Sequence, residues 1–199
     1  MRKAKIILTG IFLLVTVRAV AQVDAQYSQY WALPTFYNAA SAGRTDKLNL
    51  LATTRQQWIG MPDAPKTFMV CADMPLRFLN QNHGVGLIFS KETEGLFSNM
   101  VIGAQYAYKL KLWTGTLSLG IQLGMFDQKF DGTKVSIPSD DYHNSNDDAI
   151  PTTEMQKMVF DMGFGVFYNH KYFYAGLSAN HLNEPTVTFE EKYETYIGR

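Results

Sequence analysis

The sequence contains little charge, one cysteine and no long apolar run beyond its first residues. Asp, Glu, Lys and Arg make up 18% of the 199 residues and balance to a formal net charge of zero. Because nucleic-acid binding needs a basic surface that displaces counterions from phosphates, this balance argues against it. The one cysteine, Cys71, has no second cysteine with which to form an internal disulfide. After Gln22, no apolar run approaches the roughly 18 residues of a membrane-spanning helix, which excludes helical spans.

The N-terminus has the organisation of a signal peptide. A basic segment at 1–5 precedes a mostly apolar run at 6–17, and Ala19-Val20-Ala21 matches an A-x-A cleavage site. The apolar run is too short to cross a bilayer core about 30 Å thick. We therefore predict a signal peptide at 1–21 and an exported mature chain that begins at Gln22. An uncleaved anchor helix is the alternative.

Alternation with a period of two residues dominates the mature chain. From Thr116 to Met125 every second residue is apolar, and the residues between them are Thr, Ser, Gly and Gln. Successive side chains of a strand point to opposite faces, so this segment has one apolar face and one small or polar face. The pattern predicts about eight strands in all. Besides 116–125 they lie at 47–58, 66–74, 83–92, 101–110, 158–168, 172–180 and 186–189.

The length and composition of these segments favour a membrane barrel. The clearest ones run about nine to eleven residues, as a tilted membrane-crossing strand does, whereas soluble strands average about five or six. Their second face carries Gly, Ser, Gln and Asn, which suits a crowded barrel interior. Aromatic residues near the strand ends fit interfacial girdles. They are Trp58, Tyr106, Tyr108, Trp113, Tyr168, Tyr172 and Tyr174. We predict an all-β fold, an antiparallel transmembrane β-barrel of the outer-membrane type at 47–199, with a soluble barrel or sandwich as the alternative.

The connections and the lead-in segment complete this organisation. Short polar turns are expected at 80–82, 93–95 and 113–115, and a long polar loop at 127–154. Outer-membrane barrels have short periplasmic turns and longer outer loops, so we expect the long loop outside the cell. The segment at 22–46 shows no clear alternation and little charge. Its aromatic and small residues suggest a plug in the lumen, a partner site or an ordinary lead-in to the first strand.

No motif in the sequence predicts catalysis or metal binding. The acidic stretch at 140–148 lacks the spacing of a calcium loop and is expected to be solvated. None of the histidines pairs at metal-ligand spacing, and we interpret all four as surface or interfacial residues. They are His83, His143, His170 and His181. No Gly-x-Ser-x-Gly motif occurs, and no Ser–His–acid set stands out. We therefore predict no catalytic residue, cofactor or metal, and an outer-membrane lipid enzyme is the least favoured class.

Several short motifs, in this order, resemble the PorP/SprF family. They are Gln26-Tyr27-Ser28-Gln29-Tyr30, Pro34, Tyr37-Asn38, Ser41-Ala42-Gly43, Arg55-Gln56-Gln57-Trp58, Ala64-Pro65-Lys66-Thr67, Gly176-Leu177-Ser178 and His181-Leu182-Asn183-Glu184-Pro185. The resemblance implies a non-enzymatic outer-membrane barrel of the type IX secretion and gliding machinery. It also implies partners: periplasmic ring proteins, and secreted cargo or adhesins with a C-terminal sorting domain. Family members are longer, so we expect this chain to form an incomplete barrel.

The resemblance also suggests which residues contact partners. We expect the N-terminal segment and the outer loops to carry the contacts, with Arg55 and Lys66 as ionic or hydrogen-bonding groups. The candidate residues are Gln29, Tyr30, Asn38, Arg55, Trp58 and Lys66. The alternative function is that of a small outer-membrane porin or ligand carrier, with a polar lumen as its site.

Overall fold

The computed structural model describes residues 27–28, 30–32, 34–134, 153–183, 186–190 and 193–196. The expected signal peptide and most of the expected long loop lie outside these residues. The helices are short: η1 (Tyr30–Ala32), α2 (Pro34–Tyr37), η2 (Ala39–Ser41) and η3 (Gly132–Lys134). In this part of the chain, no helix has the length and apolar character needed to span a membrane.

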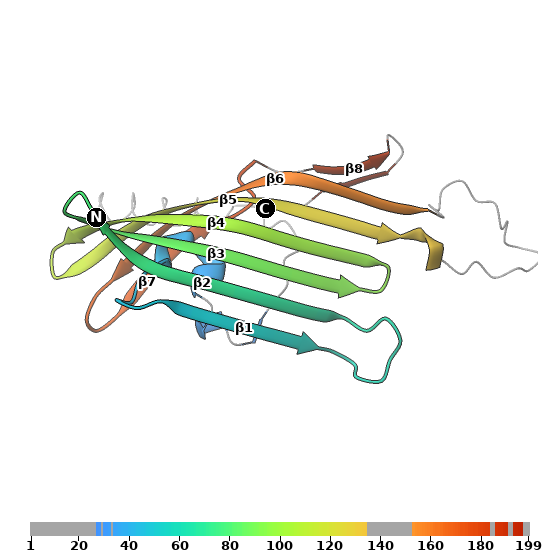
Figure 1. Cartoon of the computed structure of the whole chain (residues 1–199), viewed down its shortest axis with the longest axis horizontal. Coiled ribbons are helices and arrows are strands. Elements are labelled where there is room, and N and C mark those ends of the chain that lie inside the picture. The colour runs from blue at the N-terminus through green and yellow to red at the C-terminus, as the bar shows by residue number, and fades with distance from the viewer. Residues whose placement is uncertain are drawn as a thin grey trace, which may run out of the picture.

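Seven strands form one antiparallel sheet in which every strand pairs with its neighbours in the chain (Figure 1). They are β1 (Asn49–Gln56), β2 (Lys66–Phe78), β3 (Gln81–Glu94), β4 (Phe97–Leu112), β5 (Gly115–Asp131), β6 (Glu154–Asn169) and β7 (Tyr174–Ala179). A separate hairpin contains β8 (Thr186–Glu190) and β9 (Tyr193–Tyr196). The predicted all-β antiparallel fold is confirmed.

The sheet is strongly curled, so that it forms a half-barrel with the N-terminal helices, α2 and η2 among them, inside the curve (Figure 1). Its edges are β1 and β7, which do not pair with each other in the part of the chain that the structure describes. The prediction of an incomplete barrel is therefore confirmed for these strands. The curl gives the sheet a convex outer face and a concave inner face.

The two ends of the sheet differ in their connections. At one end, which we call the short-turn end, Leu79-Asn80 joins β2 to β3 and Trp113-Thr114 joins β4 to β5. Leu79 and Asn80 have φ angles of 51° and 58°, as the two central residues of a type I′ hairpin turn require. The opposite end, the loop end, carries the connections at 57–65, 95–96 and 132–153. Only the connection at 95–96 departs from the expected alternation of short turns and longer loops.

The central strands are longer than the alternation predicted. β5 continues to Asp131, so residues 127–131 of the expected loop pair in register with 154–158 of β6. These strand ends carry polar residues on both faces, and the apolar pattern that marks the strands stops at Met125. Backbone pairing continues past the point where the hydrophobic signal ends.

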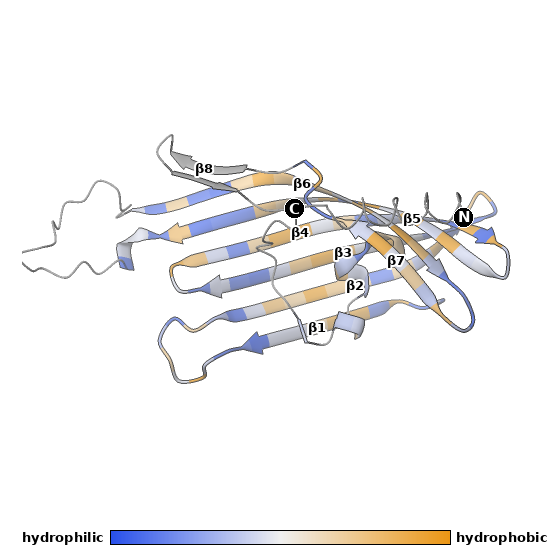
Figure 2. Cartoon of the chain, turned by 180° about the vertical axis from the view of Figure 1, so that it is seen from behind, coloured by the Kyte–Doolittle hydropathy of each residue, from blue (hydrophilic) through white to orange (hydrophobic). Residues whose placement is uncertain are grey.

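Exposed apolar side chains gather on the convex face. In β5, Leu119, Ile121 and Leu123 are 37%, 48% and 48% exposed, whereas Ser118 and Gln122, each next to one of them in the chain, are buried on the concave face. Other exposed apolar residues of the convex face are Leu87, Ile102, Met158, Phe160 and Phe164. Figure 2 shows apolar residues in the middle of these strands and more hydrophilic residues toward the loop end. A membrane barrel has this pattern, with an apolar band on its outer face and small or polar side chains on its inner face.

Aromatic side chains surround His83 near the short-turn end. The His83 ring stacks on Phe78, with 3.8 Å between the ring centroids, and its Nδ1 atom lies 2.7 Å from the Tyr106 hydroxyl. Tyr108 contacts the same ring. His83 is only 4% exposed, because it is enclosed by Phe78 and by two residues of the predicted girdle, Tyr106 and Tyr108.

Candidate functional site: a plugged concave face

Residues 34–43, which we call the plug, lie on the concave face. Pro34 begins α2, where its missing N–H leaves no hydrogen bond unmade. Asn38 caps η2, because its Oδ1 atom accepts a hydrogen bond of 2.9 Å from the Ala40 N–H. From Asn38 to Gly43 every residue is buried. Of the interpretations of the lead-in segment that the sequence left open, the structure supports the lumen plug.

Two glycines of the sheet allow the plug to approach the backbone of the strands. A Cβ atom added at Gly120 of β5 would overlap the backbone of Ala39 and Ala40, and one added at Gly84 of β3 would overlap the carbonyl group of Ala42. Only glycine permits such close packing of two backbones. The small residues of the plug therefore match small residues of the sheet.

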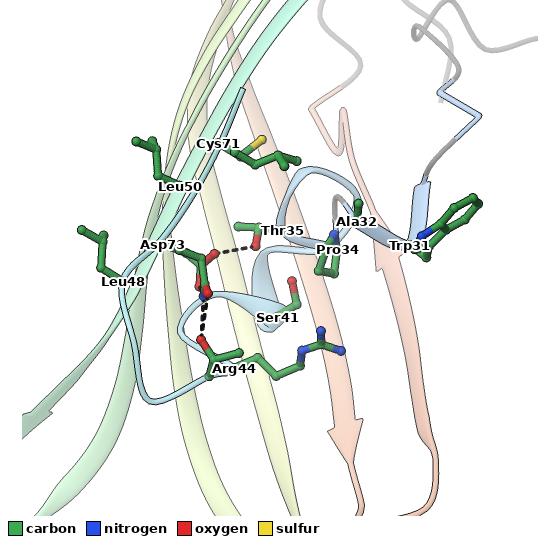
Figure 3. Close-up of a pocket in the computed structure, with 13 residues that line it drawn as sticks. Trp31, Ala32, Pro34, Thr35, Ser41, Arg44, Leu48, Leu50, Cys71 and Asp73 are labelled. Carbon is green, nitrogen blue, oxygen red and sulfur yellow. Dashed lines mark hydrogen bonds between the residues drawn. The ribbon is translucent and has the colours of Figure 1, made fainter. Parts of the chain in front are cut away.

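A buried carboxyl group, that of Asp73 on β2, holds both ends of the plug, and Figure 3 shows its hydrogen bond to Thr35. Its Oδ1 atom accepts a hydrogen bond of 3.2 Å from Thr35 Oγ1, and its Oδ2 atom accepts one of 2.8 Å from the Gly43 N–H. Asn49 Nδ2 donates to the same Oδ2 atom at 3.0 Å. The Lys109 ammonium donates to the carbonyl oxygen of Gly43. The plug is thus attached by charged groups of the sheet.

Asn38 attaches the plug to the far side of the sheet. Its Nδ2 atom donates to the carbonyl oxygens of Val166 at 3.1 Å and Leu177 at 3.2 Å. Val166 belongs to β6 and Leu177 to the edge strand β7, and the two residues are paired in the ladder. One side chain therefore connects the plug with the backbones of two strands.

Replacing Asn38 with alanine should loosen β7. The substitution removes two donor bonds of about 0.5–1.5 kcal/mol each and a helix cap worth about 1 kcal/mol. We expect hydrogen exchange of the β7 amides, followed by mass spectrometry, to become roughly tenfold faster. Asn99→Ala is the matched control, because Asn99 accepts its hydrogen bond from Gln128, away from the plug. Equal exchange of β7 in both variants would contradict the role assigned to Asn38.

An apolar cluster lies beneath the aromatic residues that precede and begin the plug. Met69, Cys71 and Ile88 are buried on the concave face. Packed against them are Tyr27, Phe36 and Tyr37. Burial raises the pKa of the Tyr27 phenol to about 12. The one thiol of the chain is therefore covered by the N-terminal segment.

Asp161 and His181 form a second buried polar contact on this face. Asp161 Oδ1 lies 3.0 Å from His181 Nδ1, and the two residues are 1% and 6% exposed. The interpretation of His181 as a surface or interfacial residue is therefore wrong, because this residue turns inward to reach the carboxyl group of β6. The sequence contains a feature that indicates such a contact, since Asp161 is the only charged residue between Met158 and Tyr168.

Two recesses border the plug. The first, of about 490 Å³, lies between the plug and β1 and is lined by Trp31, Arg44, Leu50 and Asp73 among others (Figure 3). The second, of about 390 Å³, lies at the short-turn end of the concave face. Both are concave and are lined by a mixture of polar and apolar side chains, as binding sites are.

Comparison with known protein families matches residues 19–199 to the type IX secretion system membrane proteins PorP/SprF. The chain belongs to the PorP/SprF family. No curated protein and no solved structure matches it. In this PorP/SprF member, the motif residues from Pro34 to Gly43 form the plug.

The structure separates five of the six predicted partner-binding residues of this PorP/SprF member into two groups. Arg55, Trp58 and Lys66 lie together at the loop end of β1 and β2, where Gln57 N donates to Pro65 O at 3.0 Å. Trp58 and Lys66 are exposed, and Arg55 is half-buried. On the concave side, Tyr30 is exposed in η1 and Asn38 is buried in the plug. Gln29 lies outside the described residues, and partner binding by all six stays a prediction.

Proposed function

We propose that the chain is a non-enzymatic docking component of the type IX secretion and gliding machinery in the outer membrane. In this proposal it is exported by a cleaved signal peptide at 1–21. It then supports secretion or surface anchoring of proteins with a C-terminal sorting domain, together with periplasmic ring proteins. The observation that carries the proposal is the filled concave face. A PorP/SprF half-barrel whose interior holds its own N-terminal segment is suited to presenting surfaces to partners.

The proposed orientation follows from the connections and the convex face. The apolar convex residues contact lipid, the loop end faces the cell exterior and the short-turn end faces the periplasm. Tyr30, Trp58 and Lys66 are exposed and available to partners, with Arg55 beside them. Asn38 would act indirectly, by holding the plug in place.

A small porin or ligand carrier is the second candidate. The polar and small residues of the concave face favour it, but the plug occupies that face. Planar-bilayer recordings distinguish the two. We expect the purified protein to show no steady open channel, and a stable conductance would favour the porin.

Deletion of the gene tests the docking proposal. We expect the deletion strain to lose secretion or surface display of sorting-domain cargo, and the wild-type gene to restore it. A gene carrying Asn38→Ala should restore it incompletely, whereas Asn99→Ala should restore it fully. Unchanged secretion and adhesion in the deletion strain would rule the proposal out.

A further inference from the structure

The recess at the short-turn end is built from five strands and the residues that follow the plug. Each of five neighbouring strands contributes one polar residue from a position on the concave face. They are Arg77 on β2, Asn82 on β3, Lys109 on β4, Ser118 on β5 and Asn169 on β6. Arg44 and Asp46 cover the recess from the segment that leads to β1. The recess therefore forms the mouth of the half-barrel interior at this end.

The charge of this mouth is strongly biased in a chain that is neutral as a whole. Arg44, Arg77 and Lys109 are cationic, and Asp46 is the one acidic residue that lines the recess, so the lining carries a formal charge of +2. Within the described ranges, none of the three cations forms an ion pair with a carboxylate. Such a cluster attracts an anionic group.

The donors of the recess remain available to a ligand. Among the residues that the structure describes, the Arg77 side chain makes one hydrogen bond, from Nε to Asn82 Oδ1 at 3.2 Å. The Arg44 guanidinium lies over the rings of Phe167 and Tyr174, at 5.9 and 5.6 Å from their centroids, which orients its N–H groups without neutralising them. Planar guanidinium groups bind carboxylates through paired hydrogen bonds.

We propose that this recess binds an acidic peptide segment of a periplasmic partner. The inference rests on the proposed function, which places the short-turn end in the periplasm. The recess lies on the concave face, away from the apolar convex face, so a lipid headgroup does not reach it from the bilayer. Its volume of about 390 Å³ admits side chains but not a folded domain. Pro75 and Phe167 provide apolar contact for a side-chain stem, and Asn82 and Asn169 provide amides for a peptide backbone.

A titration with purified protein in detergent tests the inference. The probe is a labelled peptide with two adjacent glutamates and blocked ends, and the comparison peptide has glutamines in their place. We expect the glutamate peptide to bind more tightly, with an affinity that falls as salt is added. Arg77→Gln should weaken binding roughly tenfold, as loss of one charged hydrogen-bonding group does. Lys91→Gln is the matched control, because Lys91 is an exposed cation on the convex face of β3.

Three results would overturn the inference: equal binding of both peptides, equal affinity of the wild type and Arg77→Gln, or displacement of the peptide by equimolar inorganic phosphate. The last would show a simple anion site. Because Arg77 is exposed, its substitution leaves the fold intact, which circular dichroism verifies. The titration needs no secretion, so its failure is distinguishable from failure of the deletion experiment.

Discussion

Replacing Gly120 with alanine should release the plug and expose Cys71 to thiol reagents. The added Cβ atom would overlap the backbone of Ala39 and Ala40, and a backbone cannot move aside as a flexible side chain does. Overpacking of this kind costs about 1–3 kcal/mol, and the plug can relieve the overlap by leaving the sheet. Its departure uncovers the cluster that contains Cys71. We expect maleimide labelling of this thiol to become roughly tenfold to a hundredfold faster.

The chain offers a matched control for this experiment. A Cβ atom at Gly163, also on the concave face, would meet the flexible Asn180 side chain at 2.9 Å, and its three nearest atoms belong neither to the plug nor to the cluster. Gly163→Ala should therefore label at nearly the wild-type rate. Because Cys71 is the only cysteine, the reagent reports a single site. If both variants labelled at the same rate, the plug would not be what protects the thiol.

Replacing Asp73 with alanine should free the plug at both of its ends. The change removes the acceptors for Thr35 Oγ1 and for the Gly43 N–H, and bonds to a charged acceptor contribute about 1.5–3 kcal/mol each. The Gly43 N–H would then be buried without this partner, so we expect the segment to open to water. Hydrogen exchange of residues 35–43 should become at least about a hundredfold faster.

Two variants provide the comparison for Asp73. Asp73→Asn keeps one oxygen acceptor in the same volume and should give an intermediate rate. Glu94→Ala removes an exposed acidic residue at the loop end of β3 and should leave the rate unchanged. Exchange in Asp73→Ala that matches the wild type would show that other contacts hold the plug.

The strands could be predicted from the sequence because one face of each meets a different environment from the other. In β5, the run from Leu117 to Met125 shows the alternation without interruption. The strand ends could not be predicted in the same way, because Asp127 to Asp131 pair through the backbone while their side chains are mostly polar. The alternation with a period of two shows where the two faces of a strand meet different environments. Backbone pairing continues beyond those residues.

The interior contacts could not be predicted from the sequence because they join residues that are far apart in the chain. Asn38 belongs to a motif of the family, but its amide donates to carbonyl groups of residues 166 and 177. Nothing local distinguishes Gly120, whose nearest neighbours are the plug residues Ala39 and Ala40, from Gly163, whose nearest neighbours are residues of the strands and of the segment after β7. Asp73 and Asp161 are charged residues within alternating segments. A single charge in such a segment indicates a side chain that binds a polar partner in the interior.

We expect the convex face to meet the hydrocarbon of the bilayer, while the concave face is closed to it. The most direct test uses the protein in lipid vesicles and a lipid-soluble diazirine that yields a carbene on illumination. Mass spectrometry should find label at Leu119, Ile121 and Leu123 and none at Ser118 or Gln122. Label spread evenly along β5, or none on these leucines and isoleucine, would contradict the claim.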